Sequence, residues 1–179
     1  MDRFGPWRED LCRSCGTCLR TCPVLRLSEA KALAVARSHP GAWVLGADTV
    51  VIIDGEVLGK PESAVEAKEM LEKLSGREHE VFTGFSIVRP ERGIRIREVV
   101  ASAVCFREIT ASELAWYVAT DEPYDKAGAY AVQGMSAFFI REIRGSYTNV
   151  IGLPLCEVID ALKSVSAIDF SGDDHVCRR

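Results

Sequence analysis

Apolar residues recur at helical spacing in four segments of the chain. In the second segment, Ser63 and Glu66 have the spacing of a capping box, and Gly76 is a residue of the kind that ends helices. The first segment follows Ser28, a suitable N-cap, and is stopped by Pro40. We therefore predict helices over residues 28–38, 63–76, 110–120 and 154–163.

Shorter apolar or alternating runs are typical of strands. They predict strands over residues 43–47, 50–53, 81–88, 94–106 and 137–143. Asp54-Gly55 is a hairpin-type turn after the second of these. Because Asp48 and Thr49 interrupt an otherwise apolar stretch, the pattern favours two short strands there instead of one.

Interspersed strands and helices predict a mixed α/β (α+β) domain around one sheet. A chain of 179 residues suits one such domain. The first 23 residues are rich in Cys, Arg, Gly and Pro and show no helical or strand period. We therefore divide the chain into a cysteine-rich leader (1–23), a folded domain (24–164) and a frayed polar tail (165–179).

Composition excludes several functions. The 22 Lys and Arg against 26 Asp and Glu give a net charge of −4, so general attraction to nucleic acid is not expected. No apolar run reaches the roughly 18 residues that span a bilayer, and the first residues lack the apolar stretch of an export signal. We expect a cytoplasmic protein without nucleic-acid or membrane partners.

Asp48 is the first candidate for chemistry. A carboxylate between apolar strand segments is costly unless it is paired, hydrogen-bonded or bound to a metal. The alternative is a turn aspartate that accepts hydrogen bonds from nearby backbone N–H groups.

Two lysines are the next candidates. Lys31 falls on one helical stripe with Leu27 and Val35, where its stem could simply cover apolar surface. Lys60, in Gly59-Lys60-Pro61, lies in a stiff loop just before a helix N-terminus, a place that attracts anions. The alternative for Lys60 is an exposed loop lysine.

Residues 121–134 form the last candidate segment. Its small residues would let the backbone approach a ligand closely. Gln133 offers a paired donor and acceptor that suits the edge of a base. The alternative is a loop with solvated charges.

Together, these features closely resemble the Maf family of nucleoside triphosphate pyrophosphatases. The resemblance covers residues 24–164 in one order and rests on six motifs. They are Ala47-Asp48-Thr49-Val50-Val51, Leu58-Gly59-Lys60-Pro61, Leu74-Ser75-Gly76 with His79, Thr83-Gly84, the Glu122-to-Gly134 block, and Gly145-Ser146-Tyr147 through Val150-Ile151-Gly152-Leu153-Pro154-Leu155.

The resemblance implies an elongated mixed sheet with flanking helices and a central cleft, similar to inosine triphosphate pyrophosphatases. It implies hydrolysis of a nucleoside triphosphate to the monophosphate and pyrophosphate, with a divalent metal, Mg or Mn. It leaves a homodimer open.

The resemblance also implies roles for single residues. Asp48 resembles the catalytic aspartate, which holds the metal or activates the attacking water. Lys31 and Lys60 resemble the lysines that neutralise the triphosphate and the leaving pyrophosphate.

The same motifs imply how the base is chosen. Thr49 and Gln133 resemble positions that govern base choice, and Lys126 lies in the Gln133 motif as a further substrate-binding residue. The Gln133 block resembles the branch that acts on dTTP and UTP, so the expected substrate is a pyrimidine nucleotide or a modified one.

The sequence departs from the family pattern near its start. Maf proteins carry a Ser-x-Ser-Pro-Arg-Arg loop that grips phosphates, and no Ser-Pro-Arg-Arg occurs in this chain. Because an arginine clamp stabilises bound phosphate, its absence predicts weaker binding and puts activity in question.

A cysteine run stands in that region. Cys12, Cys15, Cys18 and Cys22-Pro23 have the spacing of the bacterial ferredoxin [4Fe–4S] run. The same thiolates could hold zinc, or the leader could be non-functional, for example after a shift of reading frame. Two alternatives to an active pyrophosphatase therefore stay open: an iron–sulfur redox module with a nucleotide-binding fold, and an inactive Maf remnant.

Overall fold

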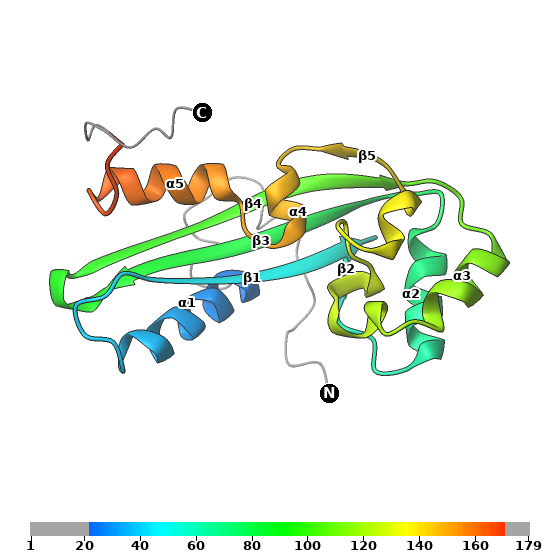
Figure 1. Cartoon of the computed structure of the whole chain (residues 1–179), viewed down its shortest axis with the longest axis horizontal. Coiled ribbons are helices and arrows are strands. Elements are labelled where there is room, and N and C mark those ends of the chain that lie inside the picture. Colours follow the sequence, from blue (N-terminus) through cyan, green and yellow to red (C-terminus); the bar gives the residue numbers. More distant parts are fainter. Residues whose placement is uncertain (1–21, 171–179) are drawn as a thin grey trace, which may run out of the picture.

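A single antiparallel sheet organises the chain in the computed structural model, which describes residues 22–170 (Figure 1). The strand order is β2-β1-β3-β4-β5, and each neighbouring pair is antiparallel. The strands are β1 (Val44–Ile53), β2 (Glu56–Leu58), β3 (Glu78–Arg89), β4 (Ile94–Phe106) and β5 (Ile140–Arg144). The sheet is elongated because β3 and β4 contain 12 and 13 residues and pair along almost their whole length.

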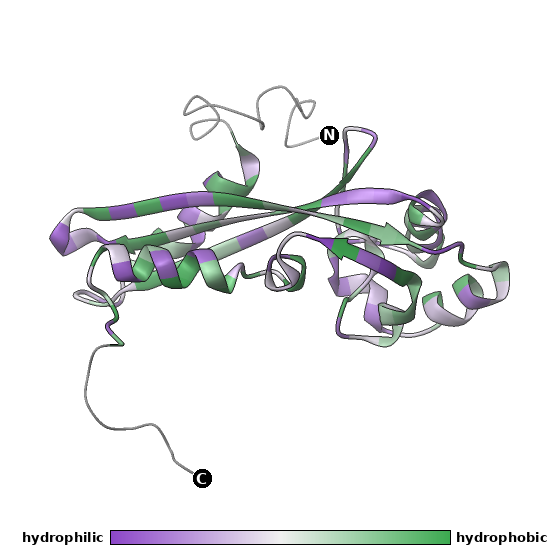
Figure 2. Ribbon diagram, turned by 90° about the horizontal axis from the view of Figure 1, so that it is seen from above, coloured by the Kyte–Doolittle hydropathy of each residue, from purple (hydrophilic) through white to green (hydrophobic). Residues whose placement is uncertain are grey.

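Helices cover both faces of this sheet (Figures 1 and 2). One face carries α1, the other carries α4 and α5, and α2 and α3 pack together near one end. The helices are α1 (Pro23–Ala36), α2 (Ala64–Leu74), α3 (Ala111–Val118), α4 (Tyr147–Ile151) and α5 (Leu155–Ser164). Short 3₁₀ turns are η3 (Pro90–Arg92), η4 (Glu122–Asp125), η5 (Ala127–Ala129) and η6 (Met135–Phe139). The prediction of a mixed α/β fold is confirmed.

Helix α1 touches the sheet backbone directly at two glycines. A Cβ atom on Gly46 would lie 2.2 Å from the Ser28 carbonyl oxygen, and one on Gly84 would lie 2.8 Å from the Val24 carbonyl carbon. No other residue type fits at this distance, so the two glycines determine how closely α1 approaches β1 and β3.

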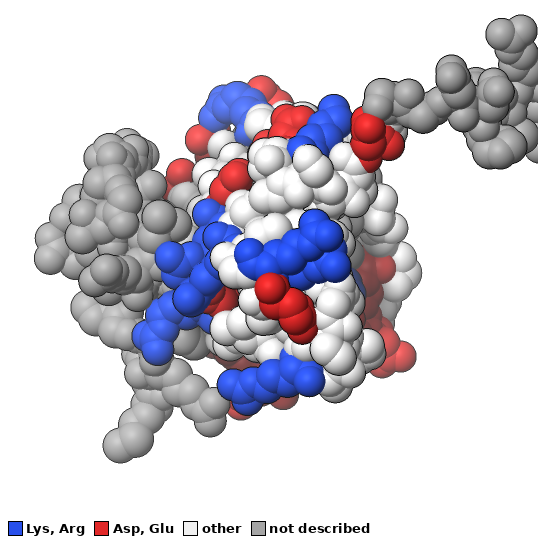
Figure 3. Space-filling view, turned by 90° about the vertical axis from the view of Figure 1, so that its left-hand side faces the viewer, with Lys and Arg blue, Asp and Glu red and all other residues white. Residues whose placement is uncertain are grey.

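Basic side chains gather at the end of the sheet where β3 turns into β4 (Figure 3). There Arg95 and Arg97 of β4 pair with Glu29 of α1, whose side chain is 11% exposed. The hydrogen bond from Arg95 holds the pKa of Glu29 below its usual value. This cluster ties α1 to β4; polar and apolar residues alternate along the same part of that strand (Figure 2).

Two predicted boundaries in the first half of the domain are wrong. Helix α1 begins at Pro23, with Cys22 as its N-cap, so Ser28 is not a cap: it is buried within the helix and shares a hydrogen bond of 2.9 Å with Ser86 of β3. Strand β1 is continuous through Asp48 because that carboxylate faces a partner lysine and a cavity instead of the core.

The second half also differs in detail. The predicted strand over 137–143 is split, since residues 137–139 belong to η6 and β5 begins at Ile140. The short helix α4 was not predicted; Ser146 caps it, and Gly152 ends it with φ +117°. The strand predicted over 81–88 lies within the longer β3, and the helices predicted over 110–120 and 154–163 correspond to α3 and α5.

Candidate active site

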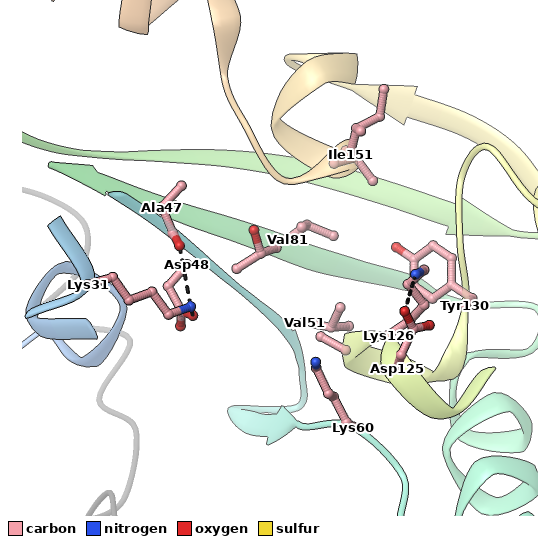
Figure 4. Close-up of a pocket in the computed structure, with 13 residues that line it drawn as sticks. Lys31, Ala47, Asp48, Val51, Lys60, Val81, Asp125, Lys126, Tyr130 and Ile151 are labelled. Atoms are coloured by element: carbon pink, nitrogen blue, oxygen red, sulfur yellow. Dashed lines mark hydrogen bonds and ion pairs between the residues drawn. The ribbon is translucent and has the colours of Figure 1, made fainter. Parts of the chain in front are cut away.

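A cavity of about 250 Å³ opens at the edge of β1 (Figure 4). Strand β2 pairs only with residues 51–53 of β1, so among the described strands the 44–50 stretch has a neighbour on one side only. The cavity is lined by Lys31, Ala47, Asp48, Thr49, Val51, Lys60, Val81, Asp125, Lys126, Ala127, Tyr130, Val150 and Ile151. Both faces of the sheet edge therefore contribute side chains.

Asp48 lies on the α1 face of the sheet. It pairs with Gly84, which touches α1, so its side chain shares a face with that helix. Lys31 of α1 donates to the Asp48 Oδ1 at 2.5 Å and to the Ala47 carbonyl at 3.4 Å (Figure 4). Because the Asp48 side chain is 18% exposed and that of Lys31 is 57% exposed, the pair sits at the cavity rim with its charges open to a ligand.

Thr49 lies on the opposite face, toward α4. Its hydroxyl is 2.8 Å from that of Thr83, its cross-strand neighbour on β3. Thr83 donates in turn to the Asn149 carbonyl of α4 at 3.0 Å. Val150 and Ile151, which follow on α4, are apolar residues that line the same cavity.

Lys60 and Lys126 reach the cavity from two loops that are bound to each other. The Gly128 N–H donates to the Gly59 carbonyl at 2.9 Å, next to Lys60. Lys126 donates to Asp125 at 2.7 Å, and in Figure 4 Lys60 lies between this pair and the Lys31–Asp48 pair. The hydrogen bond from Lys126, with the nearby charge of Lys60, holds the pKa of Asp125 below its usual value.

Glu122 fixes the loop that precedes η6. Its carboxylate accepts from the Met135 N–H at 2.8 Å, from the N–H and hydroxyl of Ser136 at 3.3 Å each, and from the Tyr117 hydroxyl at 3.0 Å. Burial raises the pKa of Glu122, but these donors outweigh it and the net shift is downward. A Cβ on Gly134 would lie 2.3 Å from the same carboxylate, so only glycine fits there.

Tyr130 lines the cavity, and His79 contacts it. The His79 Nε2 and the Tyr130 hydroxyl are 2.8 Å apart, and the two rings meet edge-on. His79 is 2% exposed, and burial lowers its pKa to about 4, so the imidazole is neutral near pH 7. Burial also raises the pKa of Tyr130.

The structure brings five of the predicted site residues together: Lys31, Asp48, Thr49, Lys60 and Lys126 all line one cavity. Gln133 does not; it is exposed and lies in the loop beyond Tyr130. Asp125, Tyr130 and Ile151 also line the cavity. The sequence placed them within candidate segments or motifs but gave none of the three a role of its own.

The cysteine run is mostly outside the described residues, which exclude Cys12, Cys15 and Cys18. Cys22 is buried at the start of α1. Within residues 22–170, no three His, Cys, Asp or Glu side chains gather in a group that could hold a metal ion. The same part of the chain contains no helix long and apolar enough to cross a membrane.

Comparison with known proteins identifies the family. The sequence model described as "Maf-like protein" matches residues 17–165, so the match begins ahead of the expected start at residue 24. A dTTP/UTP pyrophosphatase of Syntrophus aciditrophicus (strain SB) is 60% identical over 152 residues, which are 85% of this chain and 74% of the relative. One of Geobacter sp. (strain M21) is 48% identical over 180 residues, 92% of this chain and 93% of the relative.

A third relative, from Myxococcus xanthus (strain DK1622), has the same name and is 48% identical over 139 residues, 77% of this chain and 69% of the relative. The chain belongs to the Maf family. Neither the family match nor these relatives supports the iron–sulfur module or the inactive remnant as an alternative.

Proposed function

We propose that this protein is a nucleoside triphosphate pyrophosphatase that hydrolyses dTTP, UTP or modified pyrimidine nucleotides to the monophosphate and pyrophosphate. The observation that carries the proposal is the meeting of Lys31, Lys60 and Lys126 with Asp48 in one cavity. Relatives up to 60% identical bear the name dTTP/UTP pyrophosphatase. Such an activity would remove unwanted nucleotides from the cellular pool.

The lysines account for phosphate binding. A triphosphate carries several negative charges, and further charge develops on the leaving pyrophosphate as the bond to the α-phosphorus breaks. Lys31 and Lys60 act as point charges that stabilise both, and Lys126 adds a third. Because the chain lacks Ser-Pro-Arg-Arg, these lysines would supply the positive charge that an arginine clamp would otherwise help to supply.

Asp48 is the reacting carboxylate in this proposal. Water attacks the α-phosphorus, the bond to the bridging oxygen breaks, and pyrophosphate leaves with the electron pair. Two roles fit Asp48: acceptor of the proton from the attacking water, or holder of a divalent cation. The Lys31 contact orients the carboxylate toward the cavity in either role.

The residues present fit a divalent cation only if the substrate completes its coordination. Asp48 would hold the ion, and Asp125 lines the same cavity. Mg²⁺ is commonly held in this way, by one or two carboxylates together with water and substrate phosphates. A bound Mg²⁺ or Mn²⁺ would neutralise phosphate charge.

Base choice would depend on Thr49 and on the loop of Gln133. Thr49 lines the cavity, whereas Gln133 is exposed and is not a lining residue, so contact with Gln133 requires the base to extend out of the cavity. Gln133→Ala should alter the preference among bases more than the rate of phosphate hydrolysis. Equal losses across all nucleotides would count against this role. Cytoplasmic location and a homodimer stay predictions.

The test is product analysis with the full chain. We expect dTTP and UTP with Mg²⁺ or Mn²⁺ to yield one pyrophosphate and one nucleoside monophosphate per turnover, faster than ATP. Release of orthophosphate and a nucleoside diphosphate would show cleavage at the γ-phosphorus and reject the proposal. Omitting the metal from the same assay tests the cation.

A further inference from the structure

We propose that Thr83 is a positioning residue that makes the Thr49 hydroxyl a hydrogen-bond acceptor only, so that the cavity selects a base with an N–H at the matching position. This inference rests on the proposed function, since it assumes that a pyrimidine base reaches Thr49. It deepens that function by explaining how uracil and thymine would be told apart from cytosine.

The Thr83 hydroxyl is fully buried and has one proton to donate. Its oxygen lies 3.0 Å from the Asn149 carbonyl, and a carbonyl can only accept. The Thr83 proton is therefore used in that bond. In the 2.8 Å contact between Thr83 and Thr49, Thr49 must be the donor.

The Thr49 hydroxyl also has a single proton. That proton points at Thr83, so the hydroxyl can offer a ligand only oxygen lone pairs. A ligand group that meets Thr49 in the cavity must be a donor. Two acceptors facing each other there would be left unpaired.

The Asn149 backbone carbonyl also accepts from the Gly152 N–H at 2.9 Å, and side-chain bonds hold the rest of the residue. The Asn149 side-chain amide donates to the Val81 carbonyl at 3.1 Å and to the Ser102 hydroxyl at 2.9 Å, and Asn149 is fully buried. The Ser102 hydroxyl donates to the Ser146 carbonyl, so it too has a defined direction. These bonds hold Asn149 in place, and the polarity of the Thr83–Thr49 contact follows from the Asn149 backbone carbonyl, which can only accept.

Pyrimidine bases differ in this respect. Uracil and thymine carry an N3–H donor, whereas the N3 of cytosine is an acceptor. A Thr49 hydroxyl that can only accept pairs with the N3–H of uracil or thymine. With cytosine, the lone pairs of Thr49 and of N3 would face each other. The 2′-hydroxyl of the sugar is not the selected group, because dTTP lacks it.

The experiment compares binding of the α,β-imido analogues of UTP and CTP, which are not cleaved between the α- and β-phosphorus. We expect the wild-type protein to prefer the UTP analogue, and Thr83→Val to lower the ratio of affinities by about tenfold or more. Valine keeps the shape but frees the Thr49 proton to turn into the cavity. Thr83→Ser, which retains the hydroxyl, should restore the wild-type ratio.

An unchanged ratio in folded Thr83→Val, or equal weakening of both analogues, would overturn the proposal. If Thr83→Val does not fold, the affinity of the wild-type protein for N3-methyl-UTP is compared with its affinity for UTP. Loss of binding relative to UTP supports the inference, and equal binding overturns it. Since all these readouts are affinities, failure of hydrolysis would reject the proposed function and leave the selectivity result standing.

Discussion

The Lys31 ammonium lies 2.5 Å from the Asp48 carboxylate, although the two residues come from a helix and a strand that are separated by the turn after α1. The pair closes one side of the cavity and leaves Lys31 largely exposed to a ligand. An ion pair this exposed contributes little to stability, at most about 1 kcal/mol. We propose that the role of Lys31 in this pair is to bind phosphate.

Replacing Lys31 tests that role. We expect Lys31→Met to lower kcat/KM for dTTP by about 100-fold or more, because a point charge on the transferring phosphoryl group is lost. The stability of the protein should change by less than about 1 kcal/mol. Steady-state kinetics and chemical denaturation measure the two effects.

Lys68→Met is the matched control. Lys68 is exposed on α2, pairs with Glu72 one turn away and does not line the cavity. Its replacement should leave kcat/KM near the wild-type value. Equal losses in the two variants would mean that net charge, and not the position of Lys31, supports activity.

Replacing Gly46 tests how closely α1 must pack against the sheet. A Cβ there would meet the Ser28 carbonyl oxygen at 2.2 Å and the Ala32 nitrogen at 2.8 Å, so Gly46→Ala must push α1 away from the sheet. We expect a loss of about 1–3 kcal/mol in the free energy of unfolding and reduced activity as Lys31 moves from Asp48. Thermal and urea unfolding measure the first effect. Gly59→Ala, where a Cβ meets no atom within 4 Å, should cost clearly less stability.

Replacing Glu122 tests whether its carboxylate anchors the loop that contains Gln133. In Glu122→Gln an amide replaces one of the carboxylate oxygens that accept from Tyr117, Met135 and Ser136, which should destabilise the protein by about 1–3 kcal/mol. We also expect weaker discrimination among bases, because the loop loses its anchor. Asp121→Asn, at an exposed neighbouring position, is the control for charge. Unaltered stability in Glu122→Gln would contradict the anchoring role.

His79 makes stability depend on pH. Its pKa is lowered to about 4 in the folded protein from 6.5, so between these values the unfolded chain binds a proton that the folded protein does not. The contribution of neutral His79 is complete above pH 6.5 and is lost as the pH falls toward 4, by about 3 kcal/mol. His79→Gln cannot titrate there.

Urea unfolding at pH 6.5 and pH 4 measures this effect. Carboxylates also titrate in that range, so the quantity to compare is the difference between the wild-type protein and His79→Gln. We expect the wild-type protein to lose more stability on acidification. Parallel curves for the two proteins would mean that His79 is accessible to protons in the folded state.

The fold could be read from the sequence where its signals are local. Thr110 and Glu113 form a reciprocal capping box at α3, and Asp54-Gly55 joins β1 to β2 as a hairpin. The sequence-based prediction failed where the local structure depends on a residue far away in the sequence. Asp48 interrupts the apolar pattern, but β1 runs through it because Lys31 satisfies the carboxylate from another element.

The site was predictable in part for the same reason. Lys31, Lys60 and Asp48 are unusual in their local contexts, and the cavity brings them together. The sequence gave no role to Thr83 or Asn149, because the role proposed for Thr83 depends on the direction of a hydrogen bond between β3 and α4. His79 and Tyr130 lie in segments that the sequence picked out, but their protonation could not be predicted because burial determines it.

Asp48→Asn is the decisive test of the role of Asp48, because it keeps the shape of the side chain and removes its charge. Pyrophosphate release from dTTP and UTP should be measured for both proteins at several Mg²⁺ concentrations and pH values. We expect the variant to fold, to bind nucleotide and to release no pyrophosphate above background. Release at the wild-type rate would rule out Asp48 as part of the mechanism.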